Sequence, residues 1–83
     1  MTVILGLKTQ DRIESSSLIQ KILTDYGCFV RTRLGLHDIS AEFCPNYALI
    51  LLEIPDNQKA FLIENRLLDV SGVEIQRMIF DFN

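Results

Sequence analysis

Hydrophobic residues follow two different spacings along the first part of the chain. Residues 2–7 form a short apolar run that contains β-branched side chains, which is typical of a strand. After a polar break at residues 8–10, apolar residues recur every three or four positions, and this spacing predicts a helix with one apolar stripe. The stripe consists of Ile19, Ile22, Leu23 and Tyr26, with Leu18 beside it.

The ends of this predicted helix carry their own signals. Asp11 and Glu14 have the spacing of a capping box, which places a side-chain oxygen at the cap and a carboxylate three residues later. Gly27 follows the last apolar position and is expected to end the helix. Residues 28–36 then alternate, which predicts a second strand with Cys28 on its apolar face, as a small core residue.

The second half of the chain predicts three more elements. Residues 37–46 are polar and have no period, so we expect a loop, whereas residues 47–54 predict a strand that is apolar on both faces. Residues 55–57 end that strand and open a second helix, which Gly72 terminates before a last strand at residues 73–80. The buried stripe of the second helix is predicted at Ala60, Ile63, Leu67 and Val70.

The predicted order of elements, βαββαβ, indicates the fold. It is the order of an α+β, ferredoxin-like sandwich, a four-stranded antiparallel sheet with two helices on one face, and residues 1–83 form one such domain. The first and third strands are central in this topology, and both are apolar on both faces. A sheet with helices on one side normally has a polar second face. We therefore expect another copy of the chain to cover that face, in a dimer or a tetramer.

Composition and charge exclude several classes of function. The chain has 83 residues and a formal net charge of −3, and Arg31 and Arg33 are its only close basic pair, so we expect no direct nucleic-acid binding. Its two cysteines, Cys28 and Cys44, lack CxxC spacing and favour reduced thiols in the cytoplasm. The longest apolar run, residues 48–52, is far shorter than the ~20 residues of a membrane helix.

Candidate chemistry centres on the single histidine, His37. It is a candidate ligand for a small molecule or a metal, together with Cys44, or else a loop histidine that is hydrogen-bonded to local backbone. A metal site needs three or four converging ligands, so a complete site would need residues from a second copy. We therefore predict no metal, no cofactor and no enzymatic activity. The alternatives are a metal-binding or small enzymatic protein that uses His37 and Cys44, and a ligand-free docking domain.

Two further positions are candidates for anion binding. Arg33 and Arg31 lie on the face of the second strand opposite Leu34, where a guanidinium can clamp a carboxylate or phosphate; the alternative is a pair of solvated or salt-bridged edge residues. The first loop, residues 8–12, precedes a predicted helix whose free N–H groups favour anions.

Three stretches of sequence resemble a known family. KTQDR (residues 8–12), RTRLGLHD (31–38) and VSGVEIQRM (70–78), in a βαββαβ frame, are similar to the iron-only hydrogenase system regulators. These are stand-alone ACT-like domains, similar in turn to the C-terminal domain of nickel-responsive repressors. The resemblance spans almost the whole chain, and RTRLGLHD leading into an apolar strand is its most specific part.

The resemblance implies a small, homo-oligomeric regulatory module that senses a small-molecule effector. ACT-like domains bind effectors at subunit interfaces, often near the first strand–helix loop. By resemblance, Thr9, Asp11 and Arg12 are the first set of effector contacts, and Arg33 and His37 are the second set.

Overall fold

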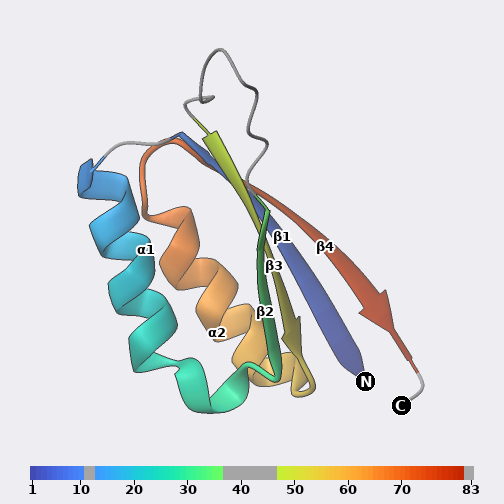
Figure 1. Cartoon of the computed structure of the whole chain (residues 1–83). Coiled ribbons are helices and arrows are strands. Elements are labelled where there is room, and N and C mark those ends of the chain that lie inside the picture. Colours follow the sequence, from blue (N-terminus) through green and yellow to red (C-terminus); the bar gives the residue numbers. More distant parts are fainter. Residues whose placement is uncertain (11–12, 37–46, 82–83) are drawn as a thin grey trace.

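The predicted α+β architecture is confirmed. The computed structural model describes residues 1–10, 13–36 and 47–81. Four antiparallel strands form one sheet in the order β2-β3-β1-β4, and both helices cover the same face of it (Figure 1). The elements are β1 (Thr2–Gln10), α1 (Ile13–Asp25), the 3₁₀ helix η1 (Gly27–Phe29), β2 (Thr32–Leu36), β3 (Tyr47–Ile54), α2 (Asn57–Leu68) and β4 (Val73–Phe80).

The first strand is longer than its sequence predicts. Residues 8–10, which are polar and were expected to break the strand, continue β1. The strand continues because β1 has partners on both sides: Lys8 lies opposite Leu49 of β3 and opposite Glu74 of β4. Pairing with two neighbours therefore overrides the low strand preference of these residues.

The second strand is shorter than predicted, and the predicted start at residue 28 is wrong. Helix α1 ends at Asp25, and Gly27 begins η1, in which the Phe29 N–H donates to the Tyr26 carbonyl at 3.0 Å. Strand β2 begins only at Thr32. Cys28 is consequently exposed in the 3₁₀ turn and does not belong to the core.

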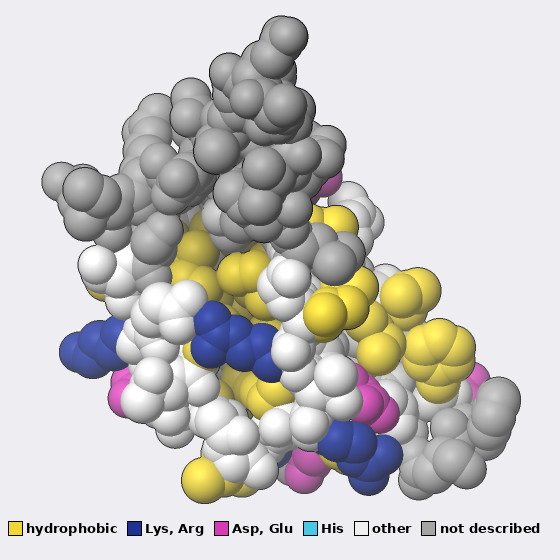
Figure 2. All heavy atoms as spheres, in the orientation of Figure 1, with side chains coloured by type: hydrophobic (Ala, Val, Ile, Leu, Met, Phe, Trp, Pro, Cys, Tyr) yellow, Lys and Arg dark blue, Asp and Glu magenta, His cyan; other side chains and the backbone are white. Residues whose placement is uncertain are grey.

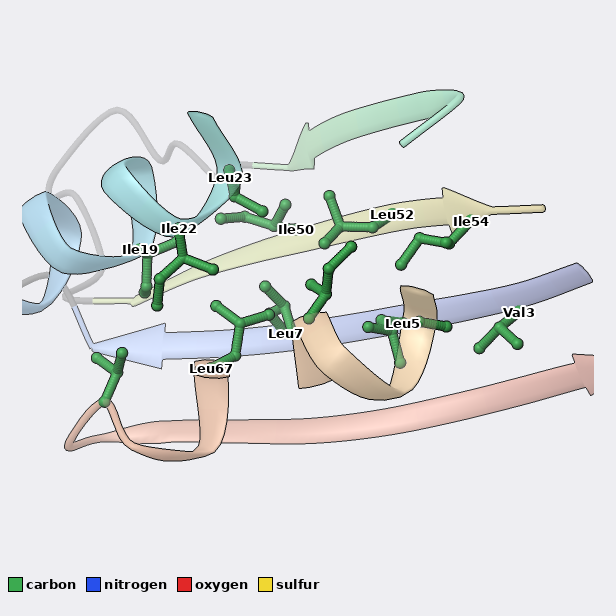
Figure 3. Close-up of a cluster of buried hydrophobic side chains, with 13 residues drawn as sticks. Val3, Leu5, Leu7, Ile19, Ile22, Leu23, Ile50, Leu52, Ile54 and Leu67 are labelled. Carbon is green, nitrogen blue, oxygen red and sulfur yellow. The ribbon is translucent and has the colours of Figure 1, made fainter. Parts of the chain in front are cut away.

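One apolar core lies between the sheet and the two helices. Side chains of β1 and β3 point toward those of α1 and α2, as the close-up shows (Figure 3). The predicted stripe of α2 is buried, whereas Leu18, expected beside the stripe of α1, is 51% exposed. The core consists of Val3, Leu5, Leu7, Ile19, Ile22, Leu23, Ile50, Leu52, Ile54, Ala60, Ile63, Leu67 and Val70.

Local signals mark the start of α2 and the turn that follows it. The Asp56 carboxylate accepts hydrogen bonds from the N–H groups of Gln58, at 2.9 Å, and Lys59, at 3.2 Å, and so caps the helix. After the helix, Gly72 has φ 82°, a conformation that costs glycine little and lets the chain reverse into β4. The predicted start of the helix at residues 55–57 is thus confirmed, whereas α2 ends at Leu68, before the end predicted at Gly72, which lies in the turn that leads into β4.

Adjacent leucines of α2 test the assignment of the core. Leu67 is fully buried and Leu68 is 57% exposed. Comparing the same substitution at these two positions of one helix separates the effect of burial on stability from the effect of helix propensity. We expect Leu67→Ala to lower the free energy of unfolding by about 2–5 kcal/mol, and Leu68→Ala by less than about 0.5 kcal/mol. Urea denaturation followed by circular dichroism measures both, and equal losses would contradict the assignment.

Candidate functional site

The face of the sheet opposite the helices has an unusual composition. Because side chains alternate along a strand, burial of Val3, Leu5 and Leu7 under the helices directs Ile4, Gly6 and Lys8 to the other side. We call that side the open face. Its described positions are Thr2, Ile4, Gly6, Lys8, Thr32, Leu34, Leu49, Leu51, Glu53, Glu74, Gln76, Met78 and Phe80.

Much of the open face is apolar and accessible. Leu34 is 48% exposed, Met78 55% and Phe80 44%. Figure 2 shows hydrophobic side chains gathered on the β4 side of the molecule. Because they are exposed, Met78 and Phe80 do not belong to the core. Contiguous apolar surface of this kind marks a binding site on a small protein.

A hollow of about 340 Å³ lies near the centre of the open face. Gly6 contributes no side chain there, and apolar side chains of the neighbouring strands surround it. Polar groups lie on its β1–β4 side. Its lining consists of Ile4, Gly6, Leu49, Leu51 and Met78 together with Lys8, Glu74 and Gln76. Its volume and its apolar lining with a few polar groups are those of small-molecule sites.

Neither the backbone nor internal packing requires a glycine at position 6. Among the described residues only Gly72 has a positive φ, so Gly6 has a conformation that any residue adopts. A Cβ atom on Gly6 would lie 3.5 Å from Leu51 Cδ2 and 3.8 Å from the Gln76 carbonyl oxygen, which is ordinary contact. A glycine inside a strand weakens the strand, and often marks close approach of a ligand or another chain. Gly6 therefore points to binding on this face.

Charged groups of the open face are confined to two places. Near β2, the Glu53 carboxylate accepts a hydrogen bond from Thr32 Oγ1 at 2.8 Å and lies 3.5 Å from Arg31 Nη1. Toward the opposite end of the strands, Lys8 and Glu74 are direct cross-strand neighbours. The surface between these groups carries the apolar side chains and the hollow.

The residues predicted to contact an effector are not brought together where the structure describes them. Thr9 is 5% exposed and lies on the helix-facing side of β1. Arg33 lies on the edge strand β2, where its Nη2 donates to Gln20 Oε1 of α1 at 2.8 Å. The two are separated by two strand spacings and four residues, which is about 17 Å.

The remaining predicted contacts, Asp11, Arg12 and His37, lie outside the described residues, as does Cys44. Within the described residues, no three His, Cys, Asp or Glu side chains cluster as a metal site requires. The described helices also include none that is long and apolar enough to cross a membrane.

The hollow is not predicted by the sequence patterns described above. Gly6 belongs to no phosphate-binding loop pattern that would single it out. The informative signal is a glycine in the middle of an otherwise apolar strand, TVILGLKTQ, at a position that alternation directs away from the helices.

Comparisons with known proteins show the fold. No protein-family model matches the sequence, and neither does any curated protein. Among solved structures, an uncharacterized protein of Thermotoga maritima superposes with a TM-score of 0.78 at 23% identity, covering 93% of this chain and 92% of that one. The ACT domain from the GTP pyrophosphokinase of Chlorobium tepidum superposes at 0.63 with 14% identity, covering 94% and 97%.

The same fold also occurs in an enzyme. SnoaB, a cofactor-independent oxygenase from Streptomyces nogalater, superposes with a TM-score of 0.62 at 9% identity, covering 99% of this chain and 95% of that one. The fold thus occurs both in an ACT domain of a GTP pyrophosphokinase and in an oxygenase. Function must therefore be argued from the site.

The substitution Gly6→Ala tests whether the fold needs this glycine. Because the added methyl group makes ordinary contacts and alanine loses less entropy on folding, we expect the free energy of unfolding to rise by about 0.5–1 kcal/mol. Urea denaturation at a concentration where the protein is monomeric measures this change. Destabilisation by more than about 1 kcal/mol would show that Gly6 serves the fold itself.

Proposed function

We propose that this protein is a small regulatory module that senses a small molecule bound in the hollow over Gly6. The observation that carries the proposal is a glycine that the fold does not need, at the floor of an apolar hollow with polar groups on one side. The ACT domain among the structural neighbours supports a sensing role, because it shows this fold serving as a domain of a larger enzyme.

The lining of the hollow defines the chemistry of the ligand. Ile4, Leu51 and Met78 favour an apolar body, since burying it removes apolar surface from water on both sides. Lys8 and Glu74 are a donor and an acceptor of opposite charge on the polar side, and they select a ligand that carries complementary polar groups at one end. The hollow suits a ligand of small-metabolite size.

The finer role that we propose is regulation of an iron-only hydrogenase system in the cytoplasm. Its support is the resemblance carried by RTRLGLHD and the two flanking stretches. Regulation requires only modest energy, because a ligand that favours one state of an assembly by about 1–3 kcal/mol changes the population of that state by 5- to 150-fold.

A screen of metabolites tests ligand binding. Amino acids, nucleotides and organic acids are added separately to the purified protein, and the unfolding temperature is measured. A ligand at 100 times its Kd stabilises the folded state by about 2.7 kcal/mol, which for a domain of this size raises the unfolding temperature by roughly 10 °C or more. Native mass spectrometry then gives the mass and stoichiometry of the complex.

Two variants locate the site. Gly6→Leu fills the hollow with a side chain that projects away from the core, so we expect the thermal shift to disappear while the fold remains. Arg12→Ala removes a contact of the alternative site at the first strand–helix loop. Loss of the shift in Arg12→Ala, but not in Gly6→Leu, would place the ligand at that loop. If no compound raises the unfolding temperature of the wild type, the result contradicts ligand sensing and favours the alternative of a ligand-free docking domain.

A further inference from the structure

We propose that the open faces of two copies of this chain pack against each other, related by a two-fold axis that runs across the strands at the level of Gly6 and Leu51. This inference concerns the partner and not the ligand, and it is tested on the ligand-free protein. Three observations carry it: the size of the face, the distribution of its charges, and the contrast with the helix side.

The size of the open face matches a dimer interface. Strands of 9, 5, 8 and 8 residues, about 4.8 Å apart, give a flat footprint on the order of 500 Å² on each copy. Two copies therefore bury on the order of 1,000 Å² of flat area together, and their projecting side chains add to this accessible surface. The total is close to the range of about 1,200–2,000 Å² for stable interfaces. Apolar side chains on all four strands contribute to this face, including Leu34 on β2 and Met78 on β4.

The register of the sheet selects the direction of the axis. Gly6 and Leu51 lie opposite each other in the middle of the face, while Glu53 lies one row toward one end and Lys8 one row toward the other, on the adjacent strand. A two-fold axis across the strands exchanges the two ends. It brings Glu53 of each copy toward the end of the other copy that carries Lys8, so the interface contains two complementary charge contacts.

The other simple axis is unfavourable. A two-fold axis parallel to the strands would exchange β1 and β3 without exchanging the ends of the face. The Glu53 side chains of the two copies would then occupy neighbouring strand positions at one end of the interface, and the two Lys8 side chains would do so at the other end, so that like charges adjoin. The arrangement across the strands places opposite charges in these neighbouring positions instead.

The helix side of the molecule offers a weaker surface. The groove between α1 and α2 contains Leu18, but Lys21, Arg66 and Asp69 also line it. The Arg66 guanidinium also donates to the Tyr26 hydroxyl at 3.4 Å. The exposed apolar residues of α2 are Phe61, Leu62 and Leu68, and the Arg77 guanidinium lies 5.4 Å from the centre of the Phe61 ring. Apolar side chains interspersed with charges are normal for a solvated surface, so the open face is the one that needs a partner.

Two matched variants test which face is used. Met78 is 55% exposed on the open face and Leu68 is 57% exposed on α2, so aspartate at either position leaves the core intact. Sedimentation equilibrium across micromolar concentrations should show a wild-type dimer or larger assembly. Met78→Asp should raise its dissociation constant about tenfold or more, because it buries a charge, whereas Leu68→Asp should leave it unchanged. A monomeric wild type, or an equal effect of Leu68→Asp, would overturn the proposal.

Charge reversal tests the axis. In Lys8→Glu homodimers both contacts pair two carboxylates, and in Glu53→Lys homodimers both pair two ammonium groups, so each variant should dimerise weakly. In the double variant Lys8→Glu/Glu53→Lys both contacts again join opposite charges, so the dissociation constant should return to the wild-type value. Sedimentation equilibrium measures all four proteins. With the axis parallel to the strands, each contact joins two like charges in the wild type and in both single variants, so single reversals that leave the dissociation constant unchanged would exclude the axis across the strands.

Discussion

The pairing of β1 with its two neighbours is the constraint on which the rest of this structure depends. β1 is hydrogen-bonded to β3 on one side and to β4 on the other, so its position in the sheet is fixed along all of its length. Val3, Leu5 and Leu7 are buried in the core on the helix-facing side of the sheet, and a shift of one residue would move them to the opposite face. The core therefore determines the composition of the open face as well, because the residues of β1 at even-numbered positions must point toward that face.

Folding and binding are consequently assigned to opposite sides of the same strand. Leu5 and Leu7 are buried in the core on the helix-facing side, and Gly6 between them forms the floor of the hollow. A site on a central strand is held more rigidly than one on a loop, because backbone hydrogen bonds on both sides position every lining residue. Such a site changes little when it is occupied. Any signal from a bound small molecule is then transmitted through contacts with a neighbouring chain rather than through rearrangement of the fold.

Periodicity in the sequence was enough to predict the fold but not the site. Residues 47–54 and 73–80 are strands with the predicted bounds, because their apolar content and flanking turn residues point to the same structure. The end of β1 was missed because residues 8–10 are polar, and pairing to two strands is not visible in local sequence. Pairing through Gln10 places Thr9 on the helix-facing side, where it is buried, and its predicted contact with an effector stays a prediction. The hollow depends on three strands at once, so no single segment predicts it.

The position of Gly6 has a consequence for stoichiometry. On the proposed axis the two copies bring their hollows together, so that they merge into one chamber shared by two chains. An asymmetric molecule in that chamber would break the symmetry of the pair and would have two equivalent orientations. Saturation would then be reached at one molecule per two chains, and occupancy by the first would exclude a second.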